Sequence, residues 1–385
     1  MPSARFSKHA HCMLVLSLLG SAACSSESPP AAMSAGGAGQ GSVLPGGGSG
    51  GGGASGGQST GGVPSASGAT SGGAAGSSAG ATTGGGGSTA GAAGGSTGGA
   101  GGGDSEPGYT APPRDINIQR TGSVTISFTP AQAAPGATSF HGGGQQQARF
   151  NADADKIQKK LVIGLGGVGT GPHNGGGLGW AADRGYHTIG LDYFNASGGD
   201  QGNNYRESWS GEDVGDADVG PMNSIMNRVK TGLNYLQGQD AGADWAYYLD
   251  AQGEVRWNDV IVFGYSFGAQ TGAAGTKYVA LHRLVATSGP GISETATWVG
   301  MPGKTPGNRC FTISGTDDGG HENHMATALR LGWPGPKVET WTSTPPYDGS
   351  SLLAVDFGHS EFCSLPTNVL ANADEVCEFA FGYTP

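Results

Sequence analysis

The chain has few charged residues and lacks any cluster of basic ones. Its 19 Lys and Arg are outnumbered by 30 Asp and Glu, which gives a formal net charge of −11 over 385 residues. Nucleic acids and anionic lipid headgroups are bound through gathered positive charge. The composition therefore predicts no nucleic-acid partner and no electrostatic contact with a membrane. An acidic surface of this kind is typical of a soluble protein.

Charged and aromatic residues are absent from Ser28 to Gly103, where Gly, Ala, Ser and Thr dominate. Such a segment buries too little apolar surface to offset the entropy lost on ordering. We expect a disordered low-complexity tether over residues 24–106, with a random-coil span of roughly 50 Å. One folded domain should then occupy residues 107–385, a usual size for an α/β domain.

Long hydrophobic runs are also missing. The apolar run Cys12–Gly20 follows Arg5 and Lys8 and precedes the small residues Ser21–Ala23, which is the pattern of a secretory signal peptide over residues 1–23. The run is too short to remain as a membrane-spanning helix. No other segment is longer and as apolar, so the sequence predicts a mature chain without such a helix.

Cys24 directly follows those small residues. In this respect the N-terminus resembles a bacterial lipoprotein signal, although Ser21 stands where that pattern usually has Leu. The resemblance implies a lipid on Cys24 and a place in the bacterial cell envelope. Ordinary cleavage after Ala23 also fits the small-residue rule and would give a freely secreted protein.

The remainder alternates strand-like and helix-like segments. One helix is predicted over Met222–Gln237, from apolar residues at helical spacing, and another over Ala269–Tyr278. The predicted strands are short and rich in β-branched residues: Ser123–Phe128, Leu161–Leu165, His187–Leu191, Val260–Phe263, Leu284–Thr287 and Cys310–Ser314. This alternation predicts an α/β fold with a mostly parallel central sheet and helices on both of its faces.

Gly264 to Gly268 matches G-x-S-x-G, with Ser266 at its centre. Five residues of this kind can also be a simple Gly-Ser turn. Here, however, they end a predicted buried strand and open a helix-compatible segment, which is the setting of a nucleophile elbow. On these residues the chain resembles the α/β-hydrolase superfamily over about residues 120–365. The resemblance implies a catalytic Ser, an acid and a His, in that chain order.

The acid is expected in the turn Ser314–Gly319, directly after a predicted strand. The resemblance points to Asp318, three residues after a glycine, with Asp317 as the second choice. Whichever aspartate is not the acid is expected to cap the turn or the following helix.

The base is expected to be His359, between Gly358 and Ser360 and downstream of the apolar run Leu352–Val355. The resemblance places a histidine in such a late loop. His321 and His324 are too near the acid in sequence. Their spacing would suit a metal, but no third ligand is evident, so no metal is predicted.

The oxyanion hole requires two backbone N–H groups. The resemblance implies Phe267 for the first and, by position, Val168 for the second, within the loop Gly166–Gly169. Gly167 remains an alternative to Val168. The same glycines could form a phosphate loop, but the Lys-Ser/Thr pair that such loops need does not follow.

An acidic segment, Gly211–Asp218, is the other chemically distinctive stretch. A calcium site is conceivable, but the spacing differs from that of an EF-hand loop. A solvated loop is the preferred interpretation.

Cysteines number only 5, and two of them, Cys12 and Cys24, belong to the N-terminal signal. The other three allow at most one intramolecular disulfide in an oxidising compartment. Some secreted cutinases and polyester hydrolases brace the region after the catalytic histidine, and this resemblance implies a Cys363–Cys377 pair. Cys310 is then expected to be a buried thiol.

Together these residues predict a serine hydrolase that cleaves carboxylic esters, small or polymeric, through an acyl-enzyme on Ser266. No cofactor is expected. The protein is expected to be a monomer. A peptidase or amidase with the same triad, or a non-catalytic binding module on this scaffold, are the alternatives. Only about twenty residues separate Ser288 from Asn308, so no large lid is expected there. Tyr265 and Phe267 are candidates for an apolar acyl wall.

Overall fold

The computed structural model describes residues 114–196 and 201–383. The predicted signal peptide, Cys24 and the tether lie outside these residues. None of the helices in the described ranges is both long and apolar enough to cross a bilayer.

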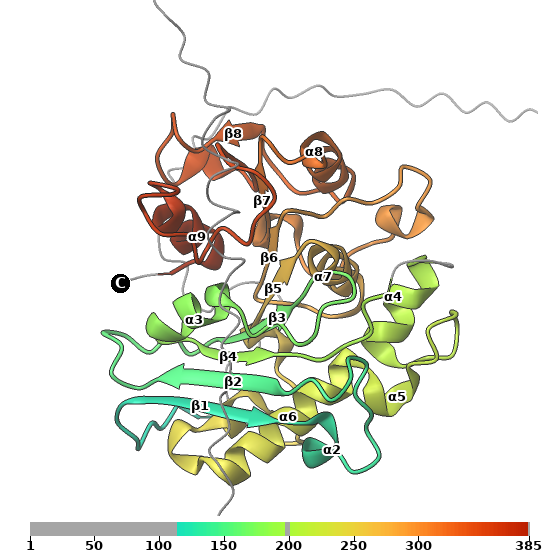
Figure 1. Ribbon diagram of the computed structural model, residues 1–385, viewed down its shortest axis with the longest axis vertical. Coiled ribbons are helices and arrows are strands. Elements are labelled where there is room, and N and C mark those ends of the chain that lie inside the picture. Colours follow the sequence, from blue (N-terminus) through green and yellow to red (C-terminus); the bar gives the residue numbers. More distant parts are fainter. Residues whose placement is uncertain (1–113, 197–200, 384–385) are drawn as a thin grey trace, which may run out of the picture. The chain divides into compact units, whose positions relative to one another are not determined.

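A nine-stranded sheet runs through the described part of the chain in the order β1-β2-β4-β3-β5-β6-β7-β9-β8 (Figure 1). The β1–β2 and β2–β4 pairs are antiparallel, and every other neighbouring pair is parallel. The strands are β1 (Ser123–Phe128), β2 (Gln146–Asn151), β3 (Leu161–Leu165), β4 (His187–Gly190), β5 (Val260–Tyr265), β6 (Arg283–Thr287), β7 (Cys310–Gly315), β8 (Lys337–Glu339) and β9 (Leu352–Val355).

Helices connect these strands and cover the sheet. They are α2 (Pro130–Ala133), α3 (Gly176–Asp183), α4 (Gln201–Ser210), α5 (Gly220–Asn223), α6 (Ile225–Gln239), α7 (Phe267–Tyr278), α8 (His321–Arg330) and α9 (Ala373–Phe381). Single 3₁₀ turns occupy Ala241–Ala243, Trp245–Tyr248, Trp257–Asp259, Thr297–Gly300, Gly307–Arg309 and Tyr347–Gly349.

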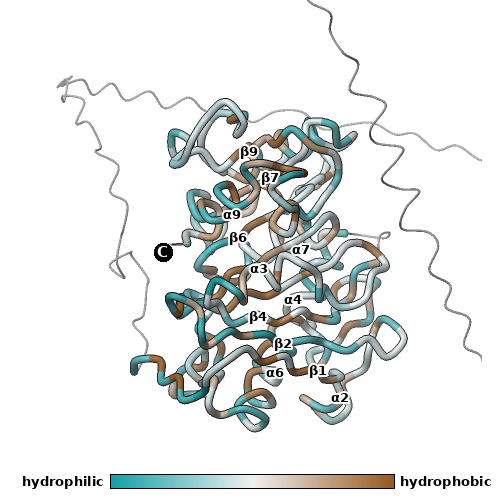
Figure 2. Tube along the Cα trace, turned by 60° about the vertical axis from the view of Figure 1, so that its left-hand side comes forward, coloured by the Kyte–Doolittle hydropathy of each residue, from teal (hydrophilic) through white to brown (hydrophobic). Residues whose placement is uncertain are grey.

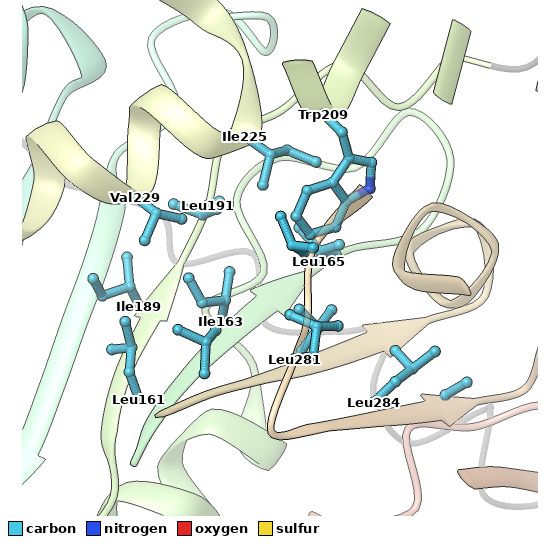
Figure 3. Close-up of a cluster of buried hydrophobic side chains, with 14 of the residues drawn as sticks. Leu161, Ile163, Leu165, Ile189, Leu191, Trp209, Ile225, Val229, Leu281 and Leu284 are labelled. Carbon is cyan, nitrogen blue, oxygen red and sulfur yellow. The ribbon is translucent and has the colours of Figure 1, made fainter. Parts of the chain in front are cut away.

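Two hydrophobic clusters form, one on each face of the sheet. Leu161, Ile163 and Leu165 of β3 belong to the cluster beneath α4, α6, α7 and α8, whereas Val162 belongs to the cluster beneath α3 and α9. Figure 3 shows the first three pointing toward side chains of α4 and α6. In Figure 2 the hydrophobic colour follows inner strands such as β4, β6 and β7. The strand side chains alternate between two buried faces, which explains the continuous apolar runs in the sequence.

The predicted α/β fold, with a mostly parallel sheet and helices on both faces, is confirmed. One predicted helix differs, because it is interrupted at Ser224. The Ser224 hydroxyl accepts the N–H of Asn227 at 3.3 Å and so caps the start of α6, while the preceding turn forms α5.

Candidate active site

The turn between β5 and α7 holds Ser266 in an uncommon backbone conformation. Its φ is 56° and its ψ is −115°, outside the regions that residues with a side chain ordinarily adopt. The Ser266 N–H donates to the carbonyl of Thr287, at the end of β6, over 2.9 Å. Ser266 therefore lies at the carboxyl edge of the parallel strands and at the start of α7, in the strand–turn–helix setting that the sequence predicts.

Two glycines make this turn possible. A Cβ atom added to Gly268 would lie 2.0 Å from the carbonyl oxygen of Leu165, and one added to Gly264 would lie 2.4 Å from the carbonyl oxygen of Gly268. Both distances are far below any ordinary carbon–oxygen contact. The close approach of β3, β5 and α7 therefore requires glycine at both positions.

Asp318 and His359 meet beside this turn. Asp318 follows β7 and His359 follows β9, and 2.7 Å separates Asp318 Oδ2 from His359 Nδ1. Because a carboxylate only accepts, His359 Nδ1 donates, and Nε2 is left as the nitrogen able to take a proton. The His359 ring packs against the ring of Tyr265, with 5.3 Å between the ring centroids. Tyr265 directly precedes Ser266 in the chain. Within the described residues no hydrogen bond yet joins Ser266 to His359. In free enzymes this contact commonly tightens only when substrate binds.

Asp318 is held as a carboxylate. Its burial opposes ionisation, but the N–H of Gly320 and the hydrogen bond from His359 outweigh that effect, so the pKa of Asp318 is lowered. The neighbouring Asp317 side chain is exposed and makes none of these contacts. Of the two predicted candidates, Asp318 is thus the one that the structure brings to His359.

His321 and His324 are buried side by side on α8. Their Nδ1 atoms lie 3.1 Å and 2.9 Å from the hydroxyl of Ser314, and His324 Nδ1 is 3.9 Å from Asp318 Oδ2. Burial lowers the pKa of His324 to about 4, against the opposing effect of Asp318. The pair therefore packs as neutral imidazoles behind the acid. The described residues include no group of three side chains suited to hold a metal ion.

The loop that carries His359 is held by contacts with three other parts of the chain. Ser288 Oγ donates to the Ser360 carbonyl at 2.8 Å and accepts the Ser360 N–H at 2.9 Å. Glu361 accepts the N–H of Gly177 in the first turn of α3, and its other oxygen lies 3.4 Å from His173 Nε2. The predicted disulfide is present and ties this loop to α9, whereas Cys310 is a buried free thiol as expected. These contacts limit the movement of the His359 backbone.

The loop after β3 passes beside Ser266. A Cβ added to Gly167 would lie 3.6 Å from Ser266 Cβ. The N–H groups of Gly167, Val168 and Phe267 find no acceptor within the described residues. N–H groups left unpaired around a serine are what an oxyanion hole needs. Both sequence candidates for the second donor, Val168 and Gly167, lie in this loop.

A cavity of about 1020 Å³ lies elsewhere, between α4 and the segment that follows β6. Tyr278, one of its lining residues, ends α7, whereas Ser266 precedes the start of that helix. At about 1.5 Å per residue the two ends of the helix are about 17 Å apart. Trp298, another lining residue, contacts Tyr205, which in turn contacts Phe267. The cavity does not include Ser266, Asp318 or His359 in its lining.

The acidic segment Gly211–Asp218 wraps around a buried carboxylate. Glu207 of α4 accepts the N–H groups of Gly215, Ala217 and Val219, the longest at 3.3 Å. The backbone of this segment thus supplies the hydrogen-bond donors to the Glu207 carboxylate.

Several polar residues beside the site were not predicted: Asp192 and Asn195 after β4, His141 in the loop before β2, and Glu361 with His173. Asp192 offered a signal, because a carboxylate directly after a predicted buried strand lies at the edge where sites form. His141, within a Gly-rich stretch, offered none.

No protein-family model matches the chain, and no curated protein is significantly similar to it in sequence. Solved structures resemble it at a distance. A feruloyl esterase module from Clostridium thermocellum in complex with sinapinate has 11% identity and a TM-score of 0.38, covering 69% of this chain and 90% of that one. An esterase from Lactobacillus rhamnosis, inhibited by a tributyrin phosphonate, has 11% identity and a TM-score of 0.37, covering 69% and 88%. A lidless α/β serine hydrolase from Xanthomonas campestris has 11% identity and a TM-score of 0.35, covering 70% and 100%.

Proposed function

We propose that this chain is a serine hydrolase that cleaves carboxylic esters through an acyl-enzyme on Ser266. The observation that carries the proposal is the 2.7 Å hydrogen bond between His359 and the buried Asp318, beside a serine in a strained turn. A buried carboxylate that accepts from Nδ1 fixes the imidazole tautomer and stabilises its charged form. That arrangement serves proton transfer.

The reaction follows from these positions. His359 Nε2 takes the proton of the Ser266 hydroxyl as its oxygen attacks the ester carbonyl carbon. The negative charge that develops on the carbonyl oxygen is stabilised by the N–H of Phe267 and one N–H of the Gly167–Val168 segment. His359 returns the proton to the departing alkoxide. Water, deprotonated by the same histidine, then hydrolyses the acyl-enzyme and releases the acid.

Covalent labelling tests the proposal without knowledge of the substrate. The purified chain, treated with a fluorophosphonate probe, should carry one adduct, on Ser266, identified by mass spectrometry. Ser266→Ala should abolish both the adduct and hydrolysis of p-nitrophenyl butyrate, whereas Ser210→Ala, a change on α4, should alter neither. Equal labelling of the wild type and Ser266→Ala would rule out Ser266 as the nucleophile.

The same material separates the alternatives. Hydrolysis of an anilide as fast as its matched ester would favour the amidase or peptidase. A chain that is folded yet takes no probe and turns over no ester would favour the non-catalytic binding module.

A further inference from the structure

Three polar residues, of which Asp192 and Asn195 are buried and His141 is partly buried, form a hydrogen-bonded network that ends on the loop beside Ser266. Asp192 Oδ1 lies 2.7 Å from His141 Nδ1, and His141 Nε2 lies 2.7 Å from Asn195 Oδ1. Asp192 and Asn195 follow β4, whereas His141 comes from the loop before β2. Asp192 is fully buried and Asn195 is 2% exposed. The network therefore connects two separate segments to the loop after β3.

Its hydrogen bonds determine which way the Asn195 amide faces. Asn195 Nδ2 donates to the carbonyl of Gly167 at 2.7 Å and to that of Thr170 at 2.8 Å. Since both partners are carbonyls, the nitrogen must lie on this side and Oδ1 must face His141. His141 therefore donates from Nε2 to Asn195, while its Nδ1 faces the Asp192 carboxyl group.

The buried charges are compensated where they lie. Asp192 Oδ2 accepts the N–H of Phe140 at 3.0 Å, and the Arg228 guanidinium is 3.8 Å away. Removing an ion pair from water is costly, and apolar side chains of similar size often stabilise a fold as well or better. This cost is explained if Asp192, His141 and Asn195 hold the loop after β3 in the position that catalysis needs.

Peptide geometry shows how these hydrogen bonds orient the N–H groups of the loop after β3. In a trans peptide, the carbonyl of one residue and the N–H of the next point in opposite directions. The Gly167 carbonyl accepts from Asn195 Nδ2 at 2.7 Å and from the Thr170 hydroxyl at 2.8 Å. Asn195, the donor from outside this loop, thus helps to aim the N–H of Val168 away from itself. Tyr193 does the same one peptide earlier, because its hydroxyl donates to the Gly166 carbonyl at 2.6 Å and so fixes the N–H of Gly167.

We propose that Asp192, His141 and Asn195 are positioning residues for the oxyanion hole, and that they act through the Gly167–Val168 peptide to present the Val168 N–H to the substrate oxygen. The proposal rests on the serine hydrolase function proposed above. It assigns the second donor to Val168 rather than Gly167. It also gives a role to His141, which lies outside the triad.

The test is a comparison of kcat with KM on p-nitrophenyl butyrate, using the full chain. Asn195→Ala and His141→Ala should lower kcat about 10–100-fold, because a misplaced donor fails mainly in the transition state. KM should change by less than about twofold. Asn195→Asp keeps the size of the side chain and an acceptor for His141 but loses the donor to Gly167, so it should lose as much kcat as Asn195→Ala.

Two tyrosine variants serve as matched controls. Tyr193→Phe and Tyr248→Phe each remove one hydroxyl from a fully buried ring, but Tyr248 contacts His187 at 2.8 Å, away from this loop. Both should lower the melting temperature slightly and leave kcat nearly unchanged. If Asn195→Ala does not fold, Asn195→Asp supplies the same comparison.

Each outcome decides between the hypotheses. If the Asn195 variants keep the wild-type kcat while fluorophosphonate still labels Ser266, the positioning network is wrong and the hydrolase stands. If Tyr193→Phe lowers kcat and the Asn195 variants do not, the second donor is Gly167 and the assignment fails. If the wild-type chain neither takes the probe nor cleaves esters, the hydrolase and the positioning network fail together.

Discussion

Asp317 and Asp318 are neighbours in sequence, yet they experience different surroundings. The Asp318 side chain is 8% exposed and accepts from both Gly320 and His359, whereas Asp317 faces solvent. The two positions therefore allow a matched test, because two adjacent residues of the same type differ only in their contacts.

Asp318→Asn is expected to lower kcat by about 10³–10⁴, because an amide leaves His359 in the wrong tautomer and does not stabilise its charge. The fold should survive, since the amide can still accept from Gly320. Asp317→Asn should keep most activity. Steady-state kinetics with melting temperatures for both variants check this expectation. Loss of activity in Asp317→Asn alone would move the acid by one residue.

At the scale of elements, the site depends on how closely a strand and a helix approach. The added Cβ positions at Gly264 and Gly268 collide with backbone atoms, which cannot move aside as a flexible side chain can. The sequence pattern could predict the elbow because this constraint is local. The contact between Asn195 and the Gly167 carbonyl is not local, since it exists only once β4 lies beside β3.

Gly268→Ala is expected to destabilise the protein by about 1–3 kcal/mol or more, since the methyl group would overlap the Leu165 carbonyl. Activity should fall as well, because Ser266 and Phe267 must shift. Gly238→Ala is the matched control, as this glycine lies in α6 with nothing within 4 Å of the added atom. It should stabilise the protein by about 0.5–1 kcal/mol through helix propensity. Chemical denaturation measures both changes, and equal effects would contradict the steric argument.

At the scale of the whole molecule, the sequence predicted the strand β1 and the parallel strands β3 to β7, but missed β2 and β8. β3 and β5 are apolar on both faces, so their runs are continuous and easy to recognise. β2 was missed because its buried positions include Gln146 and Ala148, which do not alternate as apolar residues. β8 was missed because only Val338 of its three residues is buried. Polar contacts between distant segments, such as His141 with Asp192, have no sequence period at all.

Burial of histidines gives the folded state a pH dependence. Desolvation lowers the pKa of His187 to about 4, and burial with the charges of Lys160 and Arg283 lowers that of His282 to about 3. As the pH falls, these histidines take up protons near pH 6.5 in the unfolded chain but only at lower pH in the folded one. Their effect on the free energy of unfolding is therefore absent above about pH 6.5. The free energy of unfolding should decline as the pH falls toward 4, by about 1.4 kcal/mol per pH unit for each histidine. Denaturant titrations from pH 8 to 4 test this, and His282→Gln should reduce the slope. A free energy of unfolding that stays constant from pH 7 to 5 would contradict it.

At the scale of the whole molecule, we propose that a lipid on Cys24 anchors the protein to the cell envelope. The motivation is Cys24 directly after Ala22 and Ala23, followed by a segment without charged or aromatic residues from Ser28 to Gly103. Expressed in a bacterium with its own signal, the chain should partition into detergent, and mass spectrometry should find acyl chains on Cys24. Cys24→Ala should release the protein or block its processing. Deleting residues 34–103 should shorten the tether but keep both the anchor and the activity, because such a composition contributes no core. An unmodified N-terminus after cleavage at Ala23 would show instead that the protein is freely secreted.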